Sequence, residues 1–283
     1  MKFEDDLHEH EIHTEWSRLQ DAIEKKRQIT VRRSGMLKIN WKRTLAAAAS
    51  VVLAALLTIW ISGRSSQRTY ATGYGEQKHI ILPDSSRVVL NSNSSLRFND
   101  PWWSRKRQAR IRGEAVFSVV HTVDDRPFIV RTPGGMQVSV LGTEFNIFAR
   151  GEIQRVVLNS GSVQLQYENR AAIRMVPGEM VSKVGNEGHP MKTRVDPSRY
   201  FSWVNGKLLF DNTPLKEVCQ QIEDQFGLAV SFPDSLMGNR LFNGTFPADN
   251  AQVLLKALMK TYQLDAICNG NRVEFRRKEE QPK

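Results

Sequence analysis

The chain has 283 residues, with 40 Lys and Arg against 30 Asp and Glu, and therefore a formal net charge of +10. This length accommodates two folded domains, and the presence of only two cysteines excludes a small disulfide-stapled scaffold. An excess of basic residues favours anionic partners, such as nucleic acid. Which partner it indicates depends on where the basic residues lie along the chain.

Residues 1–43 contain one amphipathic stripe. Its four apolar residues are spaced four, three and four positions apart, which puts them on one helical face: Ile12, Trp16, Leu19 and Ile23. An isolated helix of this length is marginal in water, so the stripe needs a partner or a membrane surface to lie on. A nearby histidine cluster stands among acidic residues and is interpreted as a polar helix face rather than a metal site: His8, His10 and His13.

The next segment, residues 44–61, has 18 residues and no charge. As a helix it would be about 27 Å long, close to the ~30 Å hydrocarbon thickness of a bilayer. Residues 25–43 before it carry eight cations and no acid. The positive-inside rule therefore predicts a single-pass anchor with the N-terminus in the cytoplasm and residues 62–283 outside, which excludes nucleic acid as the larger part's partner. A cleaved signal peptide and a buried core helix are the alternatives.

Residues 62–75 are interpreted as a linker, and residues 76–185 show β periodicity without a helical period. Short alternating or β-branched runs recur between turn signals, at 78–82, 87–91, 108–112, 115–119, 128–131, 137–141, 145–149, 155–158, 162–167, 172–176 and 180–184. This pattern predicts an all-β domain. Its densest basic run, 102–112, is interpreted as a solvated hairpin face, with an anionic partner or lipid headgroups as the alternatives. Residues 186–201 are interpreted as a second linker.

Residues 202–277 repeat themselves at an offset of 36 without a gap. Seven apolar positions superpose, among them Phe210 on Phe246 and Ile222 on Leu258. Each half has the pattern strand, helix, strand, with helices at 214–226 and 249–262 and a last strand at 272–275. The repeat predicts a small two-layer α/β sandwich of two βαβ units, with helices on one face of a sheet. Residues 278–283 are interpreted as a tail.

Several ordered motifs resemble the FecR family of anti-sigma regulators: Leu82-Pro83-Asp84-Ser85-Ser86, Gly113-Glu114-Ala115-Val116-Phe117, Pro127-Phe128-Ile129-Val130, Val140-Leu141-Gly142-Thr143-Glu144-Phe145-Asn146 and Pro177-Gly178-Glu179. The pattern Trp203-x-x-Gly206-x-Leu208-x-Phe210-x-Asn212-x-Pro214-Leu215 resembles the C-terminal module of the version common in Bacteroidota. That module is similar to the signalling domain of secretins and TonB-dependent transducers. Ser85 stands where the family usually has Gly, so we expect a turn without positive φ there.

The resemblance implies a regulator in the bacterial inner membrane. A TonB-dependent outer-membrane transducer would signal to its periplasmic part, and an extracytoplasmic-function (ECF) sigma factor would be controlled in the cytoplasm, through regulated proteolysis by envelope proteases. The resemblance also implies a solenoid-like β domain. Relatives usually carry several cytoplasmic helices, so here the stripe is the expected sigma-binding element. The alternative is a membrane-tethered periplasmic module that binds glycan or envelope polymer without sigma control.

The expected docking surface for the transducer is a strand edge of the C-terminal module, because edge strands expose unpaired N–H and C=O groups. The residues expected there lie on the first strand of each repeat: Leu208, Phe210, Asn243 and Thr245. We also expect residues 199–283 to fold alone.

No catalytic pattern is found, and the sequence predicts neither an enzyme nor a cofactor or metal site. Glu114 and Glu144 lie within the motifs and are expected to make structural hydrogen bonds. Cys219 and Cys268 superpose on apolar positions of the repeat, which favours two buried thiols over a disulfide.

Overall fold

The computed structural model describes residues 16–25, 41–64, 67–99, 106–167, 170–185, 187–232 and 234–278. The chain divides into two compact units, Met1–Ile61 and Ser62–Lys283. The expectations for Ile12, the three N-terminal histidines and residues 102–105 lie outside the described residues.

Two helices begin the described chain. The first covers residues 16–25, and the second is α2 (Trp41–Arg64), which contains the whole charge-free run 44–61. Helical structure is therefore confirmed for this run. Within the described parts of the chain, no helix is both long and apolar enough to cross a membrane.

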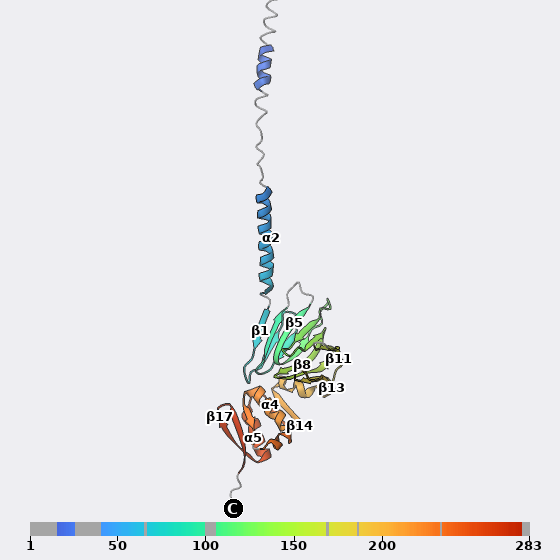
Figure 1. The fold of residues 1–283 in the computed structure, drawn as a ribbon, viewed down its shortest axis with the longest axis vertical. Coiled ribbons are helices and arrows are strands. Elements are labelled where there is room, and N and C mark those ends of the chain that lie inside the picture. The colour runs from blue at the N-terminus through green and yellow to red at the C-terminus, as the bar shows by residue number, and fades with distance from the viewer. Residues whose placement is uncertain are drawn as a thin grey trace, which may run out of the picture. The chain divides into compact units, whose positions relative to one another are not determined.

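A 13-stranded sheet follows and confirms the β-rich domain (Figure 1). Its strands are β1 (Gln67–Ala71), β2 (Lys78–Ile81), β3 (Arg87–Leu90), β4 (Ser95–Asn99), β5 (Arg107–Val119), β6 (Phe128–Arg131), β7 (Gln137–Val140), β8 (Thr143–Arg150), β9 (Ile153–Ser160), β10 (Val163–Gln166), β11 (Ile173–Met175), β12 (Glu179–Val184) and β13 (Met191–Arg194). The main path runs β11-β10-β7-β6-β5-β8-β9-β12-β13.

Strand β5 joins the two halves of this sheet. Its first half pairs with β4 and β6, and its second half pairs with β3 and β8. Gly113 lies between the halves with φ 103°, and a Cβ there would meet the Cα of Ser94 at 2.7 Å. Only glycine fits this corner, which bends one long strand where the sequence predicted two.

The bent sheet forms a half-barrel around one apolar core. The rings of Phe98 and Phe128 stack at 5.7 Å, and those of Phe117 and Phe145 stack at 5.2 Å. Among the described strands of this sheet, only β5 and β6 pair in parallel. Antiparallel pairing differs from the solenoid-like form that the family resemblance implied.

The sheet extends into both expected linkers. Strand β1, within 62–75, pairs with β4, and β13, within 186–201, pairs with β12. All four residues of β13 are exposed, so no hydrophobic alternation marks it. The short helix α3 (Ser198–Phe201) and the 3-10 turn η1 (Ser202–Asn205) then lead into the C-terminal module.

The turn between β2 and β3 corrects one expectation. Ser85 has φ 67°, so the position does take the left-handed conformation that glycine would adopt without strain. Asp84 holds the turn, because its carboxylate accepts hydrogen bonds from the backbone N–H and the hydroxyl of Ser86 at 3.1 and 2.8 Å. These local bonds offset the cost of a side chain at positive φ.

The C-terminal module keeps the predicted repeat but not the single sheet. Its elements are β14 (Lys207–Pro214), α4 (Leu215–Phe226), β15 (Ala229–Ser231), the 3-10 turn η2 (Ser235–Asn239), β16 (Leu241–Pro247), α5 (Ala251–Tyr262), β17 (Leu264–Asn269) and β18 (Arg272–Arg277). Both helices have 12 residues and begin 36 positions apart. The strands form two sheets, β14-β16 and β15-β18-β17, and the helices lie between them in Figure 1. The module therefore has three layers around a shared core.

Candidate functional sites

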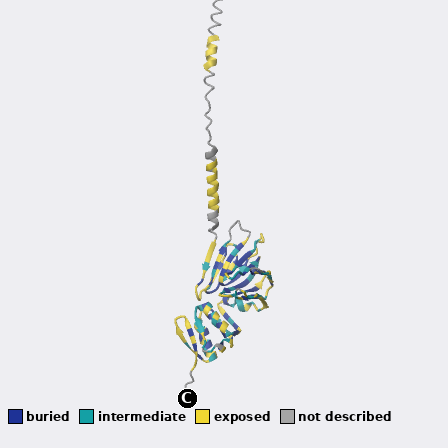
Figure 2. Ribbon diagram, in the orientation of Figure 1, coloured by how far each residue is buried: buried dark blue, intermediate teal, exposed yellow. Residues whose placement is uncertain are grey.

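The three described residues of the N-terminal stripe are exposed. Trp16, Leu19 and Ile23 lie on the helix of residues 16–25 with 61%, 53% and 55% of their surfaces accessible (Figure 2). Exposing an apolar face of this kind to water is unfavourable unless a partner covers it. Its chemistry suits a groove that accepts an amphipathic helix.

The β14-β16 sheet has one buried and one open face. Leu208 and Phe210 are only 1% and 2% exposed, and the ring of Phe210 lies 5.6 Å from that of Phe242. Burial therefore alternates along the first half of β14. However, these two side chains belong to the core of the module and cannot contact a partner.

The exposed residues of β16 lie at a free strand edge. The N–H of Ala248 donates to the carbonyl of Gly206, which fixes the alternation of hydrogen-bonded pairs in the antiparallel ladder. The backbone groups of Asn243 and Thr245 consequently point away from β14, and no other described strand pairs with them. The Asn243 side chain accepts from the N–H of Asn212, at the bulge of β14.

The β domain and the C-terminal module meet at Arg150, the last residue of β8. Its guanidinium donates to the carbonyls of Asp224 at 2.7 Å and Ser92 at 2.5 Å, and lies 3.7 Å from the Asp224 carboxylate. The carbonyl of Gln225 accepts from the hydroxyl of Ser92 and the N–H of Gly75. This junction links the C-terminal end of α4 to two loops of the sheet.

Apolar contacts continue across the same junction. Val116 of β5 is buried within the core cluster of the C-terminal module, and Val89 packs against it. The expectation that residues 199–283 fold alone is therefore not supported, because removing the sheet would expose part of that core. The sequence could not reveal this junction, since its members come from segments that lie far apart along the chain.

Burial raises the pKa of the Asp224 carboxyl above its ordinary value of 3.8, and the nearby Arg150 opposes this rise. The folded state therefore binds this proton more tightly than the unfolded state. Its contribution to stability is present below pH 3.8 and is lost as the pH rises through the raised pKa.

At pH 7 we accordingly expect the free energy of unfolding of Asp224→Asn to equal that of the wild type or to exceed it by up to about 1 kcal/mol. The neutral amide avoids the burial cost, and Arg150 keeps its bonds to two backbone carbonyls. Thermal unfolding of residues 62–283 between pH 4 and pH 7 measures this, with Asp265→Asn at an exposed position as control. A free energy of unfolding below that of the wild type at pH 7 would mean that the ion pair itself stabilises the junction.

The comparisons match both parts of the second unit. Residues 68–164 match the family model described as FecR protein, and residues 207–275 match the one described as FecR, C-terminal. The chain belongs to the FecR family. Two crystal structures of a candidate anti-sigma factor from Parabacteroides distasonis ATCC 8503 are similar in fold, with a TM-score of 0.65 and 24% identity. The match covers 75% of this chain and 100% of theirs. No curated protein matches.

The FecR motifs of this chain make structural contacts. Glu114 is buried, and its carboxylate accepts from the amide groups of Asn91 at 2.7 Å and Asn146 at 3.0 Å, as expected for a structural hydrogen bond. Glu144 similarly accepts from Ser118. These bonds connect β5 to β8 and to Asn91, the residue that directly follows β3.

Arg107 corrects the interpretation of the basic run as a solvated face. Its side chain is fully buried and donates to the Asp84 carboxylate at 2.8 Å. It also donates to the carbonyls of Val120, Arg126 and Leu141. The first FecR motif thus supplies the counter-ion of a buried cation.

Both cysteines are free. Cys219 is partly buried, and this burial raises the pKa of its thiol to about 12. Cys268 is exposed, so the expectation of a second buried thiol is wrong. It lies near the end of β17, an edge strand of the three-stranded sheet, whose last three residues are all exposed.

Proposed function

We propose that the chain is an anti-sigma regulator that receives a signal from a TonB-dependent outer-membrane transducer and passes it across the inner membrane to an ECF sigma factor. Membership of the FecR family supports the anti-sigma regulatory role and carries the proposal. The exposed N-terminal stripe supports a sigma-factor partner for residues 1–43. Envelope proteases would release that segment when the signal arrives.

Within this proposal α2 is the anchor. Its 24 residues give a helix of about 36 Å, and the charge-free run 44–61 follows eight cations within 25–43. The charge asymmetry favours a cytoplasmic N-terminus, so the FecR domain and the C-terminal module would lie in the periplasm.

This topology predicts an active enzyme when alkaline phosphatase is fused after residue 75, since the phosphatase needs an oxidising compartment to form its disulfides. Green fluorescent protein fused at the same point should be dark. The matched control is each reporter fused after residue 38, before α2, where the two results should be reversed. Fluorescence after residue 75 would contradict the orientation.

The transducer is proposed to dock at the outer edge of β16. The outward backbone groups of Asn243 and Thr245 provide the hydrogen bonds that an added strand needs, and both residues are exposed. Leu208 and Phe210 contribute indirectly, because their burial holds the sheet on the helices.

We expect Thr245→Pro to weaken binding of the transducer's signalling domain at least tenfold, because proline removes an outward N–H and obstructs an added strand. Cys268→Pro is the control, since it also removes an outward N–H, at the edge of β17. Titration calorimetry with residues 62–283 measures both. Equal losses in the two variants, or a loss for Cys268→Pro alone, would rule out the β16 edge.

A further inference from the structure

A cationic row crosses the open face of the sheet in the FecR domain. Arg97 of β4 lies directly opposite Arg110 of β5, which in turn lies opposite Arg131 of β6. Gln137 of β7 and Gln166 of β10 continue the same row. Since neighbouring strands lie about 4.8 Å apart, the three guanidinium groups start from backbone positions within ~10 Å of one another.

Like charges directly opposite one another on adjacent strands destabilise a sheet. Among the described residues no acid pairs with these arginines. The hydrogen-bond partners of Arg131 are the neutral side-chain oxygens of Gln137 at 3.1 Å and Gln108 at 3.0 Å. Arg97 and Arg110 are exposed and have no hydrogen bond or ion pair with any described residue. The repulsion between these arginines therefore destabilises the unbound sheet, and a bound anion would remove this repulsion.

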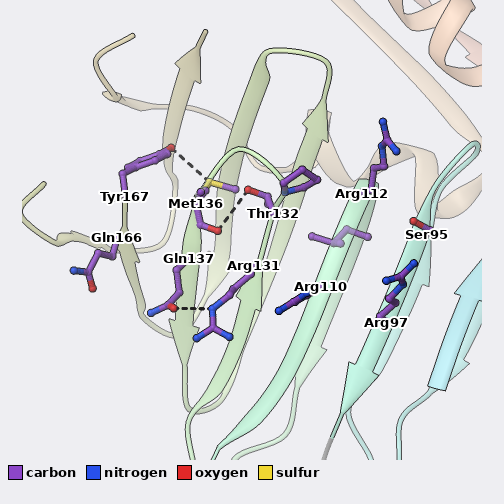
Figure 3. A pocket seen from close by; sticks show the side chains of 13 residues that line it. Ser95, Arg97, Arg110, Arg112, Arg131, Thr132, Met136, Gln137, Gln166 and Tyr167 are labelled. Carbon is purple, nitrogen blue, oxygen red and sulfur yellow. Dashed lines mark hydrogen bonds between the residues drawn. The ribbon is translucent and has the colours of Figure 1, made fainter. Parts of the chain in front are cut away.

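The row opens into a cavity of about 730 Å³, and Arg112, two positions beyond Arg110, also lines it (Figure 3). The described residues of its lining include no Asp or Glu. The remaining polar groups are amides and hydroxyls, and Figure 3 shows Ser95, Thr132 and Gln166 among them.

Among the described residues that line the cavity, Pro133 is the only apolar one that is exposed. Ile111, Met136 and Tyr167 line it but are at most 3% exposed, and the Tyr167 hydroxyl donates to the Met136 sulfur at 3.5 Å. A lipid would need an apolar rim for its acyl chains, and a protein partner would need an apolar or aromatic interface core. Apart from Pro133, the accessible groups are guanidinium, amide and hydroxyl, which complement a chain of acidic groups and hydroxyls.

We infer that this face binds an acidic oligosaccharide whose repeated carboxylate, sulfate or phosphate groups pair with Arg97, Arg110 and Arg131. The guanidinium forks bind the anionic groups in bidentate geometry, and Gln137, Gln166 and Ser95 bind the sugar hydroxyls. This site is independent of the strand edge proposed for the transducer, and it stands whether or not residues 1–43 bind a sigma factor.

The test is calorimetry of the full chain in nonionic detergent with hexagalacturonic acid, and with maltohexaose as the neutral probe of equal length. We expect micromolar binding of the acidic probe that weakens as salt is added, and none of the neutral one. The double variant Arg97→Gln/Arg110→Gln should bind the acidic probe at least tenfold more weakly. The control, Arg87→Gln/Arg272→Gln, removes the same charge from exposed positions elsewhere and should bind as the wild type does.

The double variant should also melt at or above the temperature of the unliganded wild type, because it removes a like-charge pair. If it fails to fold, Arg97→Lys/Arg110→Lys serves instead, since it keeps the charge and loses the bidentate geometry, and should still weaken binding measurably. Equal binding of hexagalacturonic acid by wild type and variants would overturn the inference. Arginine-dependent binding of hexaglutamate or of phosphatidylglycerol vesicles, without the acidic sugar, would assign the face to a protein or a membrane instead.

Discussion

Replacing Arg107 with Met should lower the free energy of unfolding of residues 62–283 by about 3–5 kcal/mol, because it leaves the Asp84 carboxylate buried without its counter-ion. Both side chains are almost fully inaccessible, at 0% and 1%. The same substitution also removes donors to the carbonyls of Val120 and Arg126, which connect separate loops. Chemical denaturation followed by tryptophan fluorescence gives the loss.

Two variants separate this explanation from a general effect of mutating the strand. Arg110→Met removes an exposed arginine three positions along β5 and should cost less than about 0.5 kcal/mol. Adding Asp84→Asn to Arg107→Met should recover more than 1 kcal/mol relative to additivity, since the unpaired charge is then gone, as expected for coupled neighbours (about 0.5–3 kcal/mol). Strict additivity would mean that the two groups do not interact.

Local pattern was sufficient to predict most of the second unit. Most strands with alternating burial, such as β3 and β10, appeared at nearly their observed bounds, although β4 was missed. The 36-residue offset located both helices of the C-terminal module. Strands β1 and β13 escaped prediction because four or more of their residues are exposed, so only pairing with a neighbour defines them. The bend of β5 at Gly113 was not predicted, because the periodicity of a sequence does not indicate a bend within a strand.

Candidate contacts were harder to predict, because each depends on residues distant in sequence. Arg107 and Asp84 are 23 positions apart, and Arg150 and Asp224 are 74 apart. The basic run gave no sign that Arg107 turns inward while Arg110 faces the cavity. That difference follows from strand alternation once the register is known. Likewise, the buried side chains of Leu208 and Phe210 follow from the helices packed beneath β14, which the repeat alone did not orient.

Replacing Trp16 with Ala should abolish capture of the cognate ECF sigma factor by residues 1–43. Trp16 is the largest apolar side chain of the exposed stripe, with 61% of its surface accessible. Burying such a ring in a partner's groove is worth on the order of 2 kcal/mol, or about 30-fold in affinity. Biolayer interferometry of the immobilised segment against the ECF sigma factors of the same organism measures the change.

Arg18→Ala is the matched control, since Arg18 is also exposed but projects about 200° around the helix from Trp16. It should leave affinity within about twofold, as expected for a residue outside the contact. Membrane insertion, followed by fractionation of the full chain, should be equal in both variants because neither alters α2 or its cations. If Trp16→Ala retains wild-type capture, the stripe is not the sigma contact. If it loses capture and insertion together, the helix of residues 16–25 lies on the membrane surface instead.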